Sequence, residues 1–235
     1  MDILIEELEG SLWVAALNNG RLEGLEVDPA HEEVRWGSIY WAKVKSVNAA
    51  LDAVFLDLDG YNTGILYNSD TRWVEADGTI RKGGAEAIGK RLKAGQMVAV
   101  QAKSAYLSSE DDEYASEESK MPQMSMDITL PGRYMVFCAM VQENRLSMRI
   151  RDKKLRKQLH LMLEGMSDVH GCILRAAAAG TQGDMLVRES KILRGAWEEI
   201  SGYFEGDEAG LIALGPDAIQ RTLSDHANQK IDRLE

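Results

Sequence analysis

The chain has 235 residues, of which 45% are hydrophobic, so it is long enough for one large domain or two small ones. No run of about 18 apolar residues occurs, and the first ten residues carry acids where a signal peptide needs bases, so the sequence predicts neither a membrane span nor secretion. The net charge of -11 argues against a polyanionic partner, because neutralising phosphates takes clustered lysine and arginine.

The first predicted element is a β-hairpin over residues 11–27, whose two strands flank Asn18-Asn19-Gly20. An Asn-Gly pair favours a turn with positive φ. Short runs with strand composition follow, separated by turn formers, and they are residues 38–47, 53–58, 64–67, 96–103 and 123–128. Five strands of this length predict a small Greek-key barrel of the OB type.

One segment inside the predicted barrel has an unusual composition. Residues 104–119 hold six acids and no base, which is too polar to bury the apolar surface that ordering requires, so we expect a mobile loop there. A short helix is expected over residues 85–92.

After residue 130 the pattern changes to alternating strands and helices. Strands are expected at residues 133–141, 172–177 and 210–214, and helices at residues 151–165 and 185–203, with a last helix opened by Pro216 at its first turn. Trp197 falls on the apolar stripe of the long helix and is interpreted as a core residue. The predicted fold class is α+β: an N-terminal hairpin, an inserted OB-type barrel and a mixed α/β domain. Cys138 and Cys172 lie in apolar segments, which favours reduced thiols in a cytoplasmic protein.

Two basic segments interrupt the acidic chain. Residues 81–103 hold six bases against one acid, and residues 145–157 hold seven bases against one acid, whereas residues 1–80 hold fifteen acids and five bases. Either basic segment is a candidate contact for phosphates. The alternative is that residues 145–157 are the solvated face of a helix.

Phe55 is the candidate functional residue that the strand pattern itself reveals. Alternation over residues 53–58 sends Val54, Leu56 and Leu58 to one face and Phe55 to the other. If the aliphatic face is the core, Phe55 lies outside, where an aromatic ring on a small barrel can stack an unpaired base. The alternative is that both faces are covered and Phe55 is ordinary core.

Several motifs, in order and at matching spacing, resemble the N-terminal half of the ribonuclease E/G family. They are NGRLEGLEVD, IYWAKVKSVNAALDAVFLDLDGYNTGILY, LKAGQMVAVQ, ITLPGRYMV, LRAAAAG and the helix ending at Trp197. The resemblance covers about residues 12–225. It implies a β-hairpin of a ribonuclease-H-like part at residues 1–36, an OB-type RNA-binding barrel at 37–128, a 5′-sensor-like α/β domain at 129–205 and a truncated ribonuclease-H-like segment at 206–235.

The resemblance also implies site residues. Phe55 matches the family's RNA-stacking aromatic, and Lys120 matches a lysine of the RNA-binding surface, to which Lys43 and Lys45 are also assigned. The residues that match the sensor pocket for a 5′-monophosphate are Gly132, Val136, Arg149 and Arg175. A guanidinium fork with backbone amides suits a terminal phosphate, and a glycine allows close approach.

The chain departs from the family at other positions. The second stacking aromatic is Ile65, the threonine after the sensor arginine is Ala176, and the first of two paired arginines is Met148. The Lys-Gly dipeptide that the family has after the tyrosine of the first barrel strand is Trp41-Ala42 here. We therefore expect 5′-monophosphate sensing to be weak or absent.

The resemblance implies RNA cleavage by aspartates that hold Mg²⁺, and these belong to a later nuclease subdomain that we expect this chain to lack. No catalytic residue or metal ligand is therefore assigned, no cofactor is expected in this chain, and Mg²⁺ is expected only if the nuclease part is supplied elsewhere. The four histidines are scattered without ligand spacing, and Asp57 and Asp59 are read as a solvated strand end rather than a cation site.

The leading hypothesis is a binder of single-stranded RNA that does not cleave it alone. One alternative is one part of a metal-dependent endoribonuclease, completed by a nuclease-domain partner chain. Another is a degenerate acidic interaction protein that has lost affinity for nucleic acid. A salt titration separates the last from the first, because real phosphate contacts weaken steeply with salt.

Overall fold

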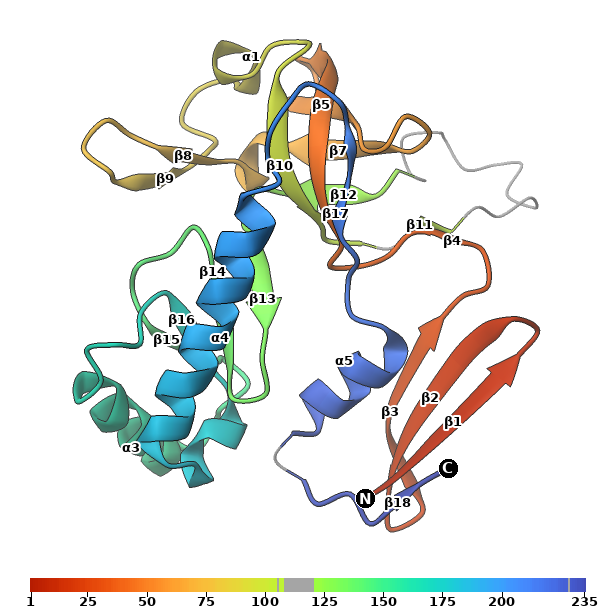
Figure 1. Cartoon of the computed structure of the whole chain (residues 1–235), viewed down its shortest axis with the longest axis vertical. Coiled ribbons are helices and arrows are strands. Elements are labelled where there is room, and N and C mark those ends of the chain that lie inside the picture. Colours follow the sequence, from red (N-terminus) through yellow and green to blue (C-terminus); the bar gives the residue numbers. More distant parts are fainter. Residues whose placement is uncertain (105, 108–120, 228) are drawn as a thin grey trace. The chain divides into compact units, whose positions relative to one another are not determined.

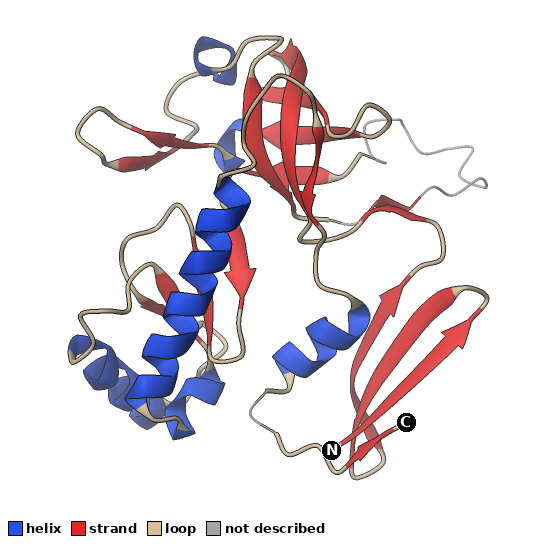
Figure 2. Ribbon diagram, in the orientation of Figure 1, coloured by secondary structure: helices blue, strands red, loops and turns tan. Residues whose placement is uncertain are grey.

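The computed structural model describes residues 1–104, 106–107, 121–227 and 229–235, and the chain divides into two compact units. The first consists of residues 1–30, 129–198 and 216–235, and the second of residues 31–128 and 199–215. Figures 1 and 2 show one closed barrel, further sheets and a few helices. The predicted α+β fold with an OB-type barrel is confirmed.

The second unit is built on a five-stranded mixed barrel. Its strands are β5 (Ile39–Asn48), β6 (Ala53–Asp57), β7 (Thr63–Tyr67), β10 (Met97–Ala102) and β12 (Gln123–Ser125). The order is β10-β12-β7-β6-β5, and β10 also pairs with β5, which closes the barrel. The barrel core includes Val44, Val54, Leu56, Leu58, Leu66, Val100 and Met124, all almost completely buried.

Strand β5 contains a β-bulge. Its register against β6 shifts between Val44 and Ser46, so Lys45 is the extra residue of the pair. A bulge bends the strand and changes the direction of the following side chains. The bulge thereby lets one long strand pair with both β6 and β10.

Smaller elements complete the second unit. They are β4 (Glu32–Val34) paired with β11 (Tyr106–Leu107), β8 (Arg72–Val74) paired with β9 (Ile80–Lys82), a 3-10 turn (Asn68–Asp70) and α1 (Ile88–Arg91). The helix expected over residues 85–92 is thus a single turn. The loop expected over residues 104–119 is wrong at Tyr106–Leu107, which forms a strand, and its residues 105 and 108–119 lie outside the described residues.

A sixth strand joins the barrel sheet from a distant part of the chain. β17 (Gly210–Ala213) pairs antiparallel with β5, although we expected it in the C-terminal segment 206–235. The Trp41 ring stacks on Phe204 with ring centroids 5.5 Å apart, and its Nε1 donates to the Gly206 carbonyl oxygen at 3.1 Å. Trp41 therefore helps to hold residues 199–215 on the barrel.

The first unit contains a four-stranded sheet with the order β18-β1-β2-β3. The strands are β1 (Asp2–Leu8), β2 (Ser11–Asn18), β3 (Arg21–Asp28) and β18 (Arg233–Leu234). The predicted hairpin is confirmed as β2 and β3, and its turn residues Asn19 and Gly20 have φ of 50° and 76°. β1 was not predicted.

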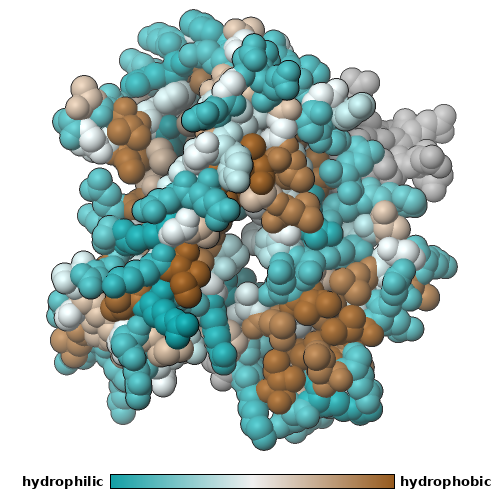
Figure 3. All heavy atoms as spheres, viewed as in Figure 1, coloured by the Kyte–Doolittle hydropathy of each residue, from teal (hydrophilic) through white to brown (hydrophobic). Residues whose placement is uncertain are grey.

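The two faces of this sheet differ. Helix α5 (Ala218–Asp225) covers one face, where Ala218 and Ile219 pack with Ile3, Val14 and Ala16. Alternation sends Trp13 and Leu25 to the other face, where they are 38% and 50% exposed. Figure 3 shows hydrophobic side chains gathered over these strands.

Helix α5 begins differently from the prediction. Its N-cap is Asp217, whose side chain accepts from the Gln220 N–H at 2.7 Å, while the Gln220 side chain accepts from the Asp217 N–H at 3.1 Å. This reciprocal capping box satisfies two backbone donors. Pro216 therefore precedes the cap and does not lie in the first turn, because an aspartate can make this bond and a proline cannot.

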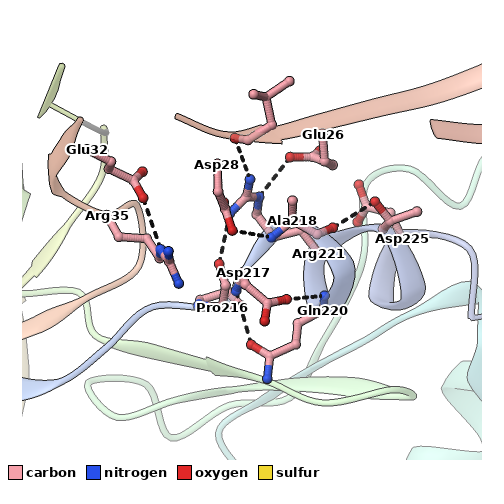
Figure 4. Close-up of polar contacts among 12 residues, drawn as sticks. Glu26, Asp28, Glu32, Arg35, Pro216, Asp217, Ala218, Gln220, Arg221 and Asp225 are labelled. Atoms are coloured by element: carbon pink, nitrogen blue, oxygen red, sulfur yellow. Dashed lines mark hydrogen bonds and ion pairs between the residues drawn. The ribbon is translucent and has the colours of Figure 1, made fainter. Parts of the chain in front are cut away.

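Arg221 ties α5 to strand β3 (Figure 4). Its Nε donates to Glu26 at 2.7 Å, its Nη1 lies 2.9 Å from the Asp28 carboxylate, and its Nη2 donates to the Val27 carbonyl oxygen at 3.0 Å. The other Asp28 oxygen accepts from the Ala218 N–H at 2.9 Å. Burial alone lowers the pKa of Arg221, but the hydrogen bonds to Glu26 and Asp28 outweigh it and raise the pKa.

The remaining part of the first unit is a second four-stranded sheet with helices. Its strands are β13 (Thr129–Pro131), β14 (Met135–Cys138), β16 (Cys172–Leu174) and β15 (Arg145–Leu146), in that order. The helices are α3 (Lys153–Glu164) and α4 (Gly183–Ser201). The predicted core position of Trp197 is confirmed, because it packs against the buried cluster that includes Leu159, Leu174 and Leu186.

Three boundaries in this part differ from the prediction. The strand expected over residues 133–141 is confined to Met135–Cys138. The strand expected over residues 172–177 ends at Leu174, because Ala176–Gly180 forms a 3-10 helix. The basic segment 145–157 is helical only from Lys153, where Asp152 caps α3 by accepting from the Lys154 N–H at 2.7 Å.

Candidate nucleic-acid interface

Phe55 lies outside the barrel core, as the alternation predicted. Val54, Leu56 and Leu58 belong to the buried barrel cluster, whereas Phe55 is half-buried and does not. On strand β6 it pairs with Ser46 of β5 and Ile65 of β7, so these three side chains share the outer face. Part of the ring surface is therefore exposed to solvent on the outer face of the barrel.

Ile65 is not an exposed counterpart of Phe55. Its side chain is only 1% exposed although it lies directly across from Phe55. It therefore offers no surface for a base. The outer face therefore holds a single half-open ring at this level of the barrel.

Two of the predicted RNA-binding lysines lie on strand β5. The Lys45 ammonium lies 3.1 Å from the Thr63 hydroxyl, on the face that carries Phe55, and is exposed. The Lys43 ammonium donates to the backbone oxygen of Asp207 at 2.8 Å, which holds residues 199–215 against the barrel. Lys120 lies outside the described residues. Lys45 is thus the described lysine best placed beside Phe55.

Three of the six bases in the first basic segment, Arg81, Arg91 and Lys103, pair with acids of their own unit. Arg91 lies 3.4 Å from both Glu75 and Glu86, and its guanidinium stacks over the Trp73 ring. Lys103 pairs with Asp70 at 2.8 Å. These three cations are therefore partly balanced by neighbouring carboxylates.

The predicted sensor residues begin at a loop that already holds a carboxylate. Glu189, on helix α4, accepts from the N–H groups of Arg133, Tyr134 and Met135 at 2.7, 2.9 and 3.0 Å. We call these three amides the amide nest. A Cβ on Gly132 would lie 2.8 Å from the Glu189 carboxyl carbon, so this glycine permits the approach of Glu189.

The two predicted sensor arginines converge on one carboxylate. Arg149 Nη1 lies 3.3 Å, and Arg175 Nη1 4.0 Å, from the same oxygen of Asp225. Arg175 also donates to the Ser224 carbonyl oxygen at 2.9 Å. We call Arg149 and Arg175 the arginine pair. Val136, the fourth predicted sensor residue, lies on β14 opposite Ile173.

The surroundings of the arginine pair are mixed in charge and exposure. The Arg149 side chain is 83% exposed, whereas Arg175 is mostly buried. Burial lowers the pKa of the Arg175 guanidinium, Asp225 raises it in part, and Arg149 lowers it again. The two departures remain: Met148 is 93% exposed, and Ala176 packs against the buried cluster of its unit.

Glu189 and Asp225 are the site residues that sequence reasoning missed. Each lies 50 or more residues from the groups it contacts, in a helix where nothing in the local pattern marks it. The carboxylates of Asp57 and Asp59, in contrast, accept from nearby turn amides, at 2.8 Å from Gly60 and at 2.7 Å from Asn62. This supports their reading as a strand end.

Two kinds of feature are absent from the part of the chain that the structure describes. It contains no group of three or more histidine, cysteine, aspartate or glutamate side chains placed to hold a metal ion. Its helices include none long and apolar enough to cross a membrane.

The barrel, the hairpin sheet and the α/β sheet define an α+β protein built around an OB-type barrel. A model of the ribonuclease E/G family matches residues 129–235. Ribonuclease E of Nostoc sp. is 27% identical over 228 residues, which cover 94% of this chain and 30% of that protein. Ribonuclease G of Salmonella typhimurium and of Escherichia coli K12 are each 25% identical over 243 residues, which cover 99% of this chain and 47% of the relative.

These matches support membership of the ribonuclease E/G family. The chain spans less than half of the length of the curated relatives it matches.

Proposed function

We propose that this protein binds single-stranded RNA through the outer face of its barrel, with Phe55 stacking a base and Lys45 meeting a phosphate. The observation that carries the proposal is the half-open phenyl ring of Phe55 outside the barrel core, with an exposed ammonium on the same face. Every base has a π-face, so such a ring binds without strong sequence preference.

The family supports the choice of RNA as partner, since the matched relatives carry the name ribonuclease. The acidic average of the chain works against this, and it limits the number of phosphate contacts. Lys43, Lys45 and Lys120 are assigned as the barrel cations, and Arg145, Arg149 and Lys157 are exposed cations of the other unit. We place the protein in the cytoplasm, where its two buried cysteines, which form no disulfide, stay reduced.

The test is the affinity of the 235-residue chain for a short oligoribonucleotide. Phe55→Ala is expected to weaken binding by roughly 1–3 kcal/mol, because the stacking surface is lost. Phe55→Leu keeps an apolar side chain without a ring and should lose most of the same energy. Val74→Ala, at a residue 64% exposed on strand β8, is the control and should bind as the wild type does.

The result that would contradict the proposal is equal affinity of the wild type and Phe55→Ala, with both folded by thermal unfolding. A salt titration adds a second criterion. Lys45→Ala should reduce the slope of log K against log salt by about one, since one phosphate contact is lost.

Cleavage of RNA is a separate question from binding. We propose that these 235 residues do not cleave RNA by themselves, and that Mg²⁺-binding aspartates supplied from elsewhere complete an endoribonuclease. The motifs matched in this chain are those of the barrel and sensor parts of the family, which supports the division. A single-turnover assay with Mg²⁺ and a 5′-labelled single strand should show binding without shorter products, and cleavage by the purified chain would overturn this part.

A further inference from the structure

The arginine pair and Asp225 form a three-membered charge cluster inside the first unit. Both guanidinium groups address one oxygen of Asp225, Arg149 at 3.3 Å and Arg175 at 4.0 Å. Two guanidinium groups around one anion are the arrangement that binds a phosphate through several charge-assisted hydrogen bonds. Here the anion is supplied by the chain itself.

A second set of anion-binding donors, the amide nest, is also occupied by a carboxylate of the chain itself. The amide nest at residues 133–135 donates all three of its N–H groups to Glu189. Such a nest of successive amides attracts anions. Because Glu189 makes three bonds at 3.0 Å or less from a packed helix, we take it as fixed, which leaves the arginine pair as the part that can change partner.

We propose that Asp225 is an internal competitor at the arginine pair, so that this site takes a phosphate group only when Asp225 is displaced. The ligand class is a terminal phosphate of RNA, and this part rests on the proposed RNA binding. Asp225 thereby sets how strongly the chain distinguishes a 5′-phosphate from a 5′-hydroxyl.

Exposure and charge both favour exchange. The side chains of Arg149 and Asp225 are 83% and 46% exposed, and ion pairs so open to water hold weakly. Arg175 also donates to the backbone oxygen of Ser224, and a rotation of the Asp225 side chain leaves this bond in place. A phosphate carries up to twice the charge of a carboxylate and three acceptor oxygens. It therefore competes well for two guanidinium groups.

The experiment compares Asp225→Asn with the wild type, using the full chain and three probes: inorganic phosphate, and one oligoribonucleotide with a 5′-phosphate or a 5′-hydroxyl. The wild type is expected to bind both oligonucleotides alike. Asp225→Asn should favour the 5′-phosphate about five- to tenfold and gain a thermal stabilisation by inorganic phosphate. Adding Arg149→Gln to this variant should return the ratio towards one.

The control is Glu208→Gln, which makes the same change of net charge at an exposed acid of the other unit. It should change the affinity for both oligonucleotides equally. The proposal is overturned if Asp225→Asn, folded by its melting curve, leaves the ratio and the effect of inorganic phosphate at the wild-type values. Loss of binding to the 5′-hydroxyl oligonucleotide in Phe55→Ala reports only on the barrel, and the inorganic phosphate arm does not depend on it, so the two proposals fail separately.

Discussion

At the scale of single residues, the proposed base contact depends on the difference in solvent exposure between the Phe55 and Ile65 side chains. Phe55 and Ile65 are cross-strand neighbours on one face, but Phe55 is half-buried and Ile65 is 1% exposed. An aromatic at position 65 would therefore have to displace its neighbours before it met a base. Gly132 shows the opposite dependence, because the absence of a side chain there lets the Glu189 carboxylate reach the amide nest.

Gly132→Ala should destabilise the protein by about 1–3 kcal/mol, because the added methyl lies 2.8 Å from the Glu189 carboxylate and forces it away from the amide nest. Gly195→Ala is the matched control: nothing lies within 4 Å of its Cβ position inside α4, and alanine should stabilise the helix by about 1 kcal/mol. Chemical denaturation measures both. Equal stability of Gly132→Ala and the wild type would show that Glu189 does not need this space.

At the scale of elements, β17 is the strand whose place the sequence did not reveal. Its local pattern is an ordinary strand, but its partner is β5, about 170 residues earlier. The stacked rings of Trp41 and Phe204 and the bond from Lys43 to Asp207 fix residues 199–215 to the barrel. They also engage one of the lysines that we assigned to RNA.

Trp41→Ala should loosen β17 and cost about 2 kcal/mol, which is roughly half of the loss at a fully buried aromatic. Limited proteolysis should then cut within residues 202–208, which are mostly exposed, faster than in the wild type. Trp41→Phe keeps a ring for Phe204 and should fall between the two. Unchanged proteolysis of Trp41→Ala would mean that backbone pairing alone holds the strand.

At the scale of the whole molecule, the C-terminal segment packs with the N-terminal segment. Residues 1–30 and 216–235 belong to one unit, although the barrel is inserted between them in sequence. Arg221 joins the two segments, since it contacts Glu26, Val27 and Asp28, which lie more than 190 residues earlier in the chain. Asp28 is 6% exposed, so these protein groups take the place of water around its carboxylate.

Arg221→Ala should destabilise the first unit by about 3–5 kcal/mol, because it leaves the buried Asp28 carboxylate without its cation. Arg188→Ala, at an exposed position of α4, should change stability by less than about 0.5 kcal/mol. Thermal unfolding followed by circular dichroism compares them. A loss for Arg221→Ala no larger than that of Arg188→Ala would show that the arginine is replaceable by water.

The sequence by itself determined what depends on neighbours along the chain. Period-2 alternation placed Phe55 opposite Val54 and Leu56, the Asn-Gly pair located the hairpin turn, and the helical stripe placed Trp197 in the core. These features follow from backbone geometry within a few residues, so they were predictable. The order of the motifs along the chain also indicated the resemblance to the ribonuclease E/G family.

Only the tertiary structure decided which residues distant in sequence form ion pairs, hydrogen bonds or paired strands. Glu189 in the amide nest, Asp225 between two arginines and β17 on the barrel each join segments at least 50 residues apart, and no local pattern records such pairings. The physical reason is that a helix or strand specifies which face it buries but not against what. Partners are determined when whole surfaces pack, so the contacts of Glu189 with the amide nest and of Asp225 with the arginine pair were not visible in the sequence.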